Sequence, residues 1–581
     1  MATWWVRGVQ YSGGTNDGTS DANAFIGTKR LSDKLNDGTV QSGDTVEFSN
    51  TNGPFTIAEA ADWPASVGIT TALSNTSAGG IILGSAQGAA SSLSGRRLSM
   101  QNGTGQAHID YRGATATGQR AVAALRLRGE DWTLSAPKIT APNWAYIRSS
   151  TGSTRIAGPT VGGDAEQASF ENIGLMALGS GFTIEDFDLS GGFGWCRYAL
   201  YVGVNASQVS GASNNKQVTI RRGQLYGCHS GFQIQPFGPT GTDNDYEMRP
   251  GTRLLLHDVF IDQACWGIYP GELIKARNAA GHGNGGGMLG RWAGRAIMRD
   301  FEATGEYQDG FAMGFDSGVI CLRPYIHDIG IPLIDEWQWG TSWTLQTGLA
   351  NGEGNGVKMG LSSATGTGVP PTTWLGTDGT SSGLETNINL PELRNILHGA
   401  RIVNCQGMGV TSNNSSGAFI GSCEIFDTGR QGIALFMPAG KVGNFFLHNN
   451  FIRKLTSEPT NAPLHIQAGC RVWAYNNVSY SNQAVGTQRD VIIDSTSGLV
   501  KDKNLLVTGR IGGSNAAGWN TANDISVQVP PWTDGAGLPA GHALRTAGTR
   551  AGIQAARSHG ANRSRSGALW PAGNLPLGCY Q

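Results

Sequence analysis

Charged residues are scarce in this chain. Asp, Glu, Lys and Arg together make up 15% of the 581 residues, below the roughly 25% of ordinary globular proteins. The 42 basic residues nearly cancel the 43 acidic ones, for a net charge of −1, and no run of Lys and Arg stands out. Nucleic-acid-binding proteins carry a basic patch or stripe. We therefore expect no nucleic acid among the partners.

Long apolar runs are missing as well. The longest fall far short of the ~18 residues that a membrane span requires, so we expect no membrane partner. The opening "MATWWVRGVQYSGG" has neither the basic nor the apolar region of a secretory signal. We expect a virion protein of a phage tail, released by lysis, or an extracellular protein whose signal was removed.

Closely spaced cysteines are also absent from the sequence. The 8 cysteines are scattered singly and no CxxC occurs, which excludes the usual spacing of metal clusters. Most lie in strand-like runs such as "GVICLRP" and "ARIVNCQG". We expect buried thiols that pack as small apolar side chains.

Glycine is abundant, at 87 of 581 residues, about twice its usual share of roughly 7%. From about residue 180, short apolar strands alternate with turns rich in Asn, Asp and Gly, as in "FTIEDFDLSGG", "VICLRPYIHDIG" and "NFFLHNNFIRKL". Periods of about 20–50 residues indicate solenoids, propellers or arrays. Helical solenoids are excluded because the 3.6-residue pattern is missing, and four-stranded propeller blades of about 40 residues fit less well.

These features predict an all-β fold, a right-handed parallel β-helix with a short N-terminal capping helix and an irregular C-terminal tail. Residues 1–60 are expected to form the cap, with an amphipathic helix in "FIGTKRLSDKL", and the first coil. The β-helix itself is expected over 61–510, with a long insertion at about 331–390. The Pro/Gly-rich segment 511–581 is expected to pack back on the helix.

Several stretches resemble the pectate-lyase-like β-helix superfamily, and polysaccharide lyase family nine in particular. The opening "TWWV…NDGTS…SGDTVEF" and the ending "GLPAGHALRTAGT…ALWPAGNLPLGCYQ" resemble the two ends of these proteins. In the middle, "GEYQDGF", "IDEWQW", "GNGVKMG" and "LHGARIVNCQGMGVTSNN" follow the order of the family's catalytic coils. The chain also resembles a bacteriophage tailspike or tail-fibre version of this fold.

The resemblance implies roles for individual residues. Lys358, in the GNG-x-K element, corresponds to the catalytic base. Asp309, and Asp335 with Glu336 one coil later, correspond to ligands of a calcium ion. Where the family has a third acid, this chain has Trp339. Together with Trp337, this side chain is expected to stack on sugar rings.

Such lyases cut acidic polysaccharides by β-elimination. A base removes the C5 proton of a uronate, and the C4 oxygen leaves. Calcium or a fixed positive group must neutralise the uronate carboxylate. A lysine with the ordinary pKa of about 10.4 is a poor base at neutral pH. The small neighbours of Lys358, and the lack of an acidic partner beyond Glu353, are expected to favour the free amine and a close approach by the sugar.

Structural explanations compete with each of these roles. Lys358 and Asp309 can be ordinary turn residues, Asp335 and Glu336 surface acids, and the tryptophans can pack the insertion. His398 and the pair Asn413–Asn414 are expected to be structural.

Three functions remain open from the sequence. The first is a phage tailspike that binds, and by lysine-based and calcium-assisted β-elimination degrades, an acidic glycan of the host surface. The second is a secreted pectate-lyase-like enzyme. The third is a carbohydrate-binding or structural β-helix of the virion without catalysis. The expected partners are an acidic polysaccharide or host surface glycan, two further copies in a homotrimer, and other tail proteins of the virion.

Overall fold

The chain forms two compact units, Met1–Ala296 with Pro332–Thr347, and Ile297–Ile331 with Gly348–Gln581. The computed structural model describes residues 1–8, 13–51, 55–56, 78–83, 93–102, 105–110, 120–140, 173–190, 196–205, 217–226, 228–237, 253–262, 268–269, 296–304, 309–313, 319–330, 354–359, 395–413, 417–437, 443–454, 462–475, 477–481, 489–494, 498–503, 506–507, 510–512 and 525–526.

Unit 1 begins with a strand and a capping helix. Strand β1 (Thr3–Arg7) pairs with β2 (Phe25–Ile26), and helix α1 (Thr28–Asn36) follows. The sequence predicts a helix in the segment "FIGTKRLSDKL", and the observed helix ends at Asn36, one residue beyond that segment. Its Leu31 and Leu35 are buried. An amphipathic helix of this kind covers the exposed end of a solenoid core.

The remaining strands of unit 1 form three parallel ladders and a short antiparallel pair. The first ladder contains β1, β3 (Thr45–Phe48), β6 (Arg97–Ser99), β11 (Thr133–Ser135), β14 (Thr183–Glu185) and the first parts of β17 (Gln217–Tyr226) and β19 (Arg253–Asp262). The second contains β4 (Phe55–Thr56), β9 (His108–Asp110), β12 (Lys138–Thr140), β15 (Asp188–Ser190) and the second parts of β17 and β19. The third contains β5 (Ala78–Leu83), β10 (Arg120–Glu130), β13 (Ile173–Ser180), β16 (Cys196–Asn205), β18 (Cys228–Phe237) and β20 (Ile268–Tyr269). Strands β7 (Gln101–Asn102) and β8 (Gly105–Gln106) make the antiparallel pair.

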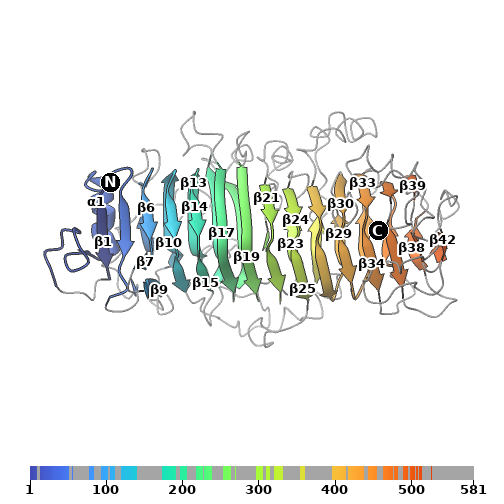
Figure 1. Ribbon diagram of the computed structural model, residues 1–581, viewed down its shortest axis with the longest axis horizontal. Helices are drawn as coiled ribbons and strands as arrows, with labels where there is room; N and C mark the ends of the chain where they lie inside the picture. The colour runs from blue at the N-terminus through green and yellow to red at the C-terminus, as the bar shows by residue number, and fades with distance from the viewer. Residues whose placement is uncertain are drawn as a thin grey trace, which may run out of the picture. The chain divides into compact units, whose positions relative to one another are not determined.

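Unit 2 repeats the same three-strand coil (Figure 1). Its first ladder contains β21 (Ala296–Arg299), β24 (Val319–Leu322), β27 (Asn395–His398), β30 (Gly417–Gly421), β33 (Gly443–His448), β36 (Cys470–Tyr475) and β39 (Gly498–Lys503). The second contains β22 (Glu302–Thr304), β25 (Tyr325–Ile329), β28 (Arg401–Cys405), β31 (Glu424–Phe426), β34 (Phe451–Lys454), β37 (Val478–Ser481), β40 (Leu506–Val507) and β42 (Ile525–Ser526). The third contains β23 (Asp309–Met313), β26 (Asn355–Met359), β29 (Val410–Asn413), β32 (Ile433–Phe436), β35 (Leu464–Ile466), β38 (Arg489–Ile493) and β41 (Arg510–Gly512).

The register of the first ladder of unit 2 gives the length of a coil. Ile396 pairs with Phe419, and Phe419 pairs with Phe446. The interval from one partner to the next is one coil, and it lies within the period of roughly 20–50 residues that is typical of solenoids. Equivalent residues of neighbouring strands point the same way and stack along the ladder. The predicted all-β class and parallel β-helix are confirmed by this pairing.

A column of glycines and a column of isoleucines pack against each other inside unit 2. Ile326, Ile402, Ile425 and Ile452 are register partners on the second ladder. They face Gly310, Gly356, Gly409 and Gly432, where an added Cβ would collide with a γ-methyl carbon of the isoleucine in each case. Glycine is therefore needed at these positions because the second and third ladders approach closely at this corner.

The corner between the first and second ladders is a tight turn with left-handed backbone. In unit 2, φ is +51° at Asp300, +52° at Arg323, +55° at Ser422 and +57° at Asn449. The inward residue that follows is Asn450 in the last of these turns, and it is fully buried. Its Nδ2 donates to the carbonyl of Ile420 at 2.9 Å, and its Oδ1 accepts from the backbone N–H of Cys423 at 3.0 Å. Buried asparagine thus satisfies backbone groups here.

Within the described part of the chain, four cysteines are buried thiols: Cys321, Cys405, Cys423 and Cys470. For these four, the expectation of apolar packing is confirmed. In the parts of the chain that the structure describes, no helix is long and apolar enough to cross a membrane. The predicted C-terminal segment 511–581 lies almost wholly outside the described residues.

Candidate functional site

Lys358 lies on β26, in the third ladder of unit 2. Strand residues alternate between the two faces of a sheet. Val357 and Met359 are fully buried in the core, so Lys358 between them is directed to the outer face. Its side chain is 16% exposed, and its register partners are Ala312 on β23 and Thr411 on β29. The ammonium group thus reaches the outer face while most of its stem is covered.

Asp309, at the start of the neighbouring strand β23, is the partner of this lysine. The Oδ2 atom of Asp309 lies 3.6 Å from Lys358 Nζ. Its Oδ1 atom accepts a hydrogen bond of 2.7 Å from Nδ2 of Asn355, which is also its register partner. Asp309 is only 4% exposed and Asn355 only 2%. Two residues that the sequence singled out are therefore brought together from adjacent coils.

This pairing corrects two parts of the sequence interpretation. Lys358 does have an acidic partner, because Asp309 is close in space although it lies one whole coil earlier in the chain. The glycines beside Lys358 also serve the fold. A Cβ at Gly356 would lie 2.5 Å from Cγ2 of Ile402, and one at Gly354 would lie 3.2 Å from Cα of Gly330. The space beside these glycines is filled, so they do not open room for a sugar.

Calcium does not fit the part of the site that the structure describes. Calcium takes six to eight oxygen ligands, and both oxygens of Asp309 already face nitrogen donors. Among the residues described, no group of three or more His, Cys, Asp or Glu side chains is placed to hold a metal ion. The other predicted ligands, Asp335 and Glu336, lie outside the described residues, as do Trp337 and Trp339.

The outer column of the third ladder continues beyond Lys358 to a histidine that sequence reasoning missed. Thr411 pairs with Ala434, and Ala434 with His465. His465 is 9% exposed, with Nε2 at 3.4 Å from Oδ2 of Asp494 and Nδ1 at 3.3 Å from Nε2 of Gln431. Burial lowers the pKa of His465, against the opposing effect of Asp494. The signal in the sequence was the central place of His465 in the apolar strand "PLHIQ".

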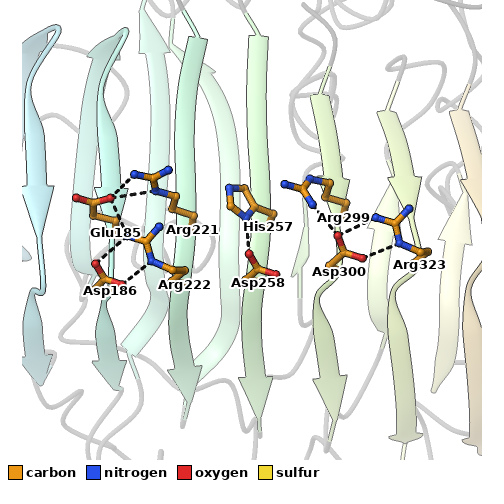
Figure 2. Close-up of polar contacts among 9 residues, drawn as sticks. All are labelled: Glu185, Asp186, Arg221, Arg222, His257, Asp258, Arg299, Asp300 and Arg323. Carbon is orange, nitrogen blue, oxygen red and sulfur yellow. Dashed lines mark hydrogen bonds and ion pairs between the residues drawn. The ribbon is translucent and has the colours of Figure 1, made fainter.

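Other charged side chains gather at the corner between the first and second ladders (Figure 2). In unit 1, Arg221 and Arg222 both donate to Oε2 of Glu185, at 2.7 and 2.9 Å. In unit 2, Arg323 forms a two-point contact with Asp300, from Nε at 2.7 Å and Nη2 at 2.8 Å. The hydrogen bond from Arg323 lowers the pKa of Asp300. These groups satisfy one another across neighbouring coils, so we assign them to the fold.

Some solved structures are similar to this chain at low sequence identity. No protein-family model matches the chain, and no curated protein matches it. Among solved structures, the Dettilon tailspike protein is 11% identical, with 88% of this chain and 68% of that one covered and a TM-score of 0.33. A rhamnogalacturonan lyase is 11% identical, with 87% of each chain covered and a TM-score of 0.32. Pectate lyase Pel9A is 10% identical, with 100% and 96% covered and a TM-score of 0.27.

Proposed function

We propose that the protein binds an acidic polysaccharide on the outer face of the third ladder of unit 2 and cleaves it by β-elimination at Lys358. One observation carries this proposal. It is the placement of a single amine, paired with a buried carboxylate, on the outer face of a β-helix strand. An amine that reaches this outer face is the kind of group that a β-elimination needs as its base.

The lengths of the connecting segments support a binding site on the face that carries Lys358. Between β24 and β25 the chain needs only Arg323 and Pro324. By contrast, the whole segment 330–354 separates β25 from β26, and the still longer segment 360–394 separates β26 from β27. Insertions in repeat folds tend to fall on one face, which is often the binding face. Both long segments of this coil border the strand that carries Lys358.

In the proposed reaction, the Lys358 ammonium first gives up one proton to solvent and becomes the free amine. It then takes the C5 proton of a bound uronate, and the electron pair of the broken C5–H bond becomes the C4–C5 double bond. The C4–O bond breaks, and its electrons leave with the oxygen of the departing sugar, which takes a proton from solvent. Asp309 stabilises the ammonium that forms on Lys358, as an orienting carboxylate does for a catalytic base. Removing a general base of this kind typically costs about 10²–10⁴ in rate.

Two variants of Lys358 test the proposal against a panel of acidic polysaccharides. Lys358→Ala removes the amine, and Lys358→Arg keeps the positive charge but cannot act as a base, because arginine is always protonated. We expect both variants to lose at least about 100-fold in the release of unsaturated, ultraviolet-absorbing products. Lys34→Ala is the matched control. It removes a lysine of helix α1 whose Nζ atom lies 2.7 Å from Oδ2 of Asp37. Undiminished release by Lys358→Arg would contradict the role of base.

The biological setting is a further part of the proposal. We place the enzyme on a phage tail, as a homotrimer that meets other tail proteins and the glycan of a host surface. A secreted lyase and a non-catalytic carbohydrate-binding β-helix are the alternatives. The variants above separate the last of these from the two enzymes, because a non-catalytic protein releases no product.

A further inference from the structure

Asp309 carries a charge that the surrounding structure must compensate. With 4% of its surface exposed, the carboxylate is removed from water, and an isolated buried charge is costly. Among the described residues, the Lys358 ammonium at 3.6 Å provides a counter-charge. The buried carboxylate and the outward lysine thus form an ion pair between two neighbouring coils.

Asn355 fixes the direction of this carboxylate through a chain that spans three coils. A backbone N–H can only donate a hydrogen bond. Since the N–H of Met408 donates to Oδ1 of Asn355 at 3.0 Å, the Nδ2 of Asn355 is the atom that faces Asp309. Nδ2 donates to one oxygen of Asp309, and the other oxygen is left for the lysine. Asn355 itself is 2% exposed, so this arrangement is held within the packed corner.

We infer that Asp309 and Asn355 are positioning residues for Lys358, and that Asp309 is not a ligand of calcium. A calcium ion on Asp309 would sit about 2.3–2.6 Å from the oxygen, next to the ammonium, where like charges repel. On its other side, Asp309 meets an amide N–H, which cannot bind a cation. The inference on ion pairing stands by itself, whereas the effect on catalysis rests on the proposed function.

A set of four proteins tests the inference without any polysaccharide. The wild type, Asp309→Asn, Lys358→Met and the double variant are melted in excess EDTA and in millimolar calcium chloride. We expect Lys358→Met to lower the melting temperature because it takes the ammonium away from the buried carboxylate. Adding Asp309→Asn removes that charge, so the double variant should have a higher melting temperature than Lys358→Met. Any rise in melting temperature that calcium gives the wild type is retained in Asp309→Asn.

Two results would overturn the inference. One is a calcium-dependent rise in the wild type that is lost in Asp309→Asn, because a ligand that binds only the folded state stabilises it. The other is strict additivity of the two substitutions, which would mean that the side chains do not interact. Neither result depends on cleavage, so failure here is distinct from failure of the proposed function.

Kinetics on a polysaccharide that the wild type cleaves tests the positioning role. Asp309→Asn is expected to lower kcat at least about 10-fold, with KM changed less than twofold, because a misdirected base is slower without weakening substrate binding. Added calcium does not restore the rate. Asp309→Glu, which keeps the charge, is expected to recover part of the loss. A purely structural role predicts no such split between kcat and KM, so equal changes in both would count against positioning.

Discussion

His465 is a single residue whose burial makes stability depend on pH. Burial lowers its pKa below the ordinary value of about 6.5 in spite of the contact with Asp494. The folded state therefore favours the neutral ring. Its contribution to stability is fully present above about pH 6.5 and is lost as the pH falls toward the folded-state pKa, because the unfolded chain then binds the proton more readily.

We expect His465→Gln to change this dependence. Between pH 7.5 and pH 5.5, the free energy of unfolding should fall less in His465→Gln than in the wild type, since glutamine does not titrate. Urea unfolding at both pH values measures the difference. Lys34→Ala, in unit 1, should follow the wild type. An identical pH dependence of His465→Gln and the wild type would mean that another group is responsible.

For individual site residues, the sequence allowed fewer correct predictions than it did for the overall fold. That Lys358 faces outward follows from its place in the alternating run "NGVKM", and this much could be predicted. Its ion pair with Asp309 could not, because the intervening segment has no fixed length that would set the register of the two strands. Asn355 was missed for the same reason, since its role depends on a backbone N–H of a third coil.

At the scale of elements, the glycine column explains why "DGF", "NGV", "MGV" and "QGI" recur in the sequence. Each glycine is the second residue of such a group and faces an isoleucine of the second ladder. Repeated x-G-apolar triplets in the sequence therefore indicate the close approach of the second and third ladders. Within the GNG-x-K element, Gly356 and Val357 belong to the packing of the coil, and Lys358 lies on its outer face.

Gly356→Ala tests this packing. The new Cβ would lie 2.5 Å from Cγ2 of Ile402 and 2.7 Å from the carbonyl oxygen of Gly409, and overpacking of this kind costs about 1–3 kcal/mol. We expect that loss in the free energy of unfolding, measured by urea denaturation. In the double variant with Ile402→Ala, the loss should be smaller than the sum of the two single losses, because one of the two clashes is removed. A neutral Gly356→Ala would contradict the close approach.

For the whole chain, composition and the period of the strands were enough to predict a parallel β-helix, because each coil repeats the same pattern. The path of the long connections was not predictable from that pattern. The segment 331–390 was expected to be an insertion, yet β26 lies within it and joins the third ladder. A short strand flanked by two long segments has too little periodicity to be recognised as part of a coil of its own.

The stacked arrangement also determines how unit 2 should open. In a solenoid each coil is held mainly by its two neighbours, so terminal coils open more easily than interior ones. Cys423 lies in the coil that begins with β30, and Cys470 two coils later on β36. Both are buried, and burial raises the pKa of Cys423 to about 12, so neither thiol should react with a thiol reagent until its coil opens.

We expect Cys470 to be labelled faster than Cys423 in mild denaturant, by at least several-fold, when labelling is followed by mass spectrometry of peptides. The physical reason is that Cys470 has fewer coils between it and the C-terminal end of the ladders. Complete denaturation should make the two rates equal, which controls for intrinsic reactivity. Equal rates in mild denaturant would instead show that unit 2 opens in one cooperative step, and the nearest-neighbour description of its coils would then be wrong.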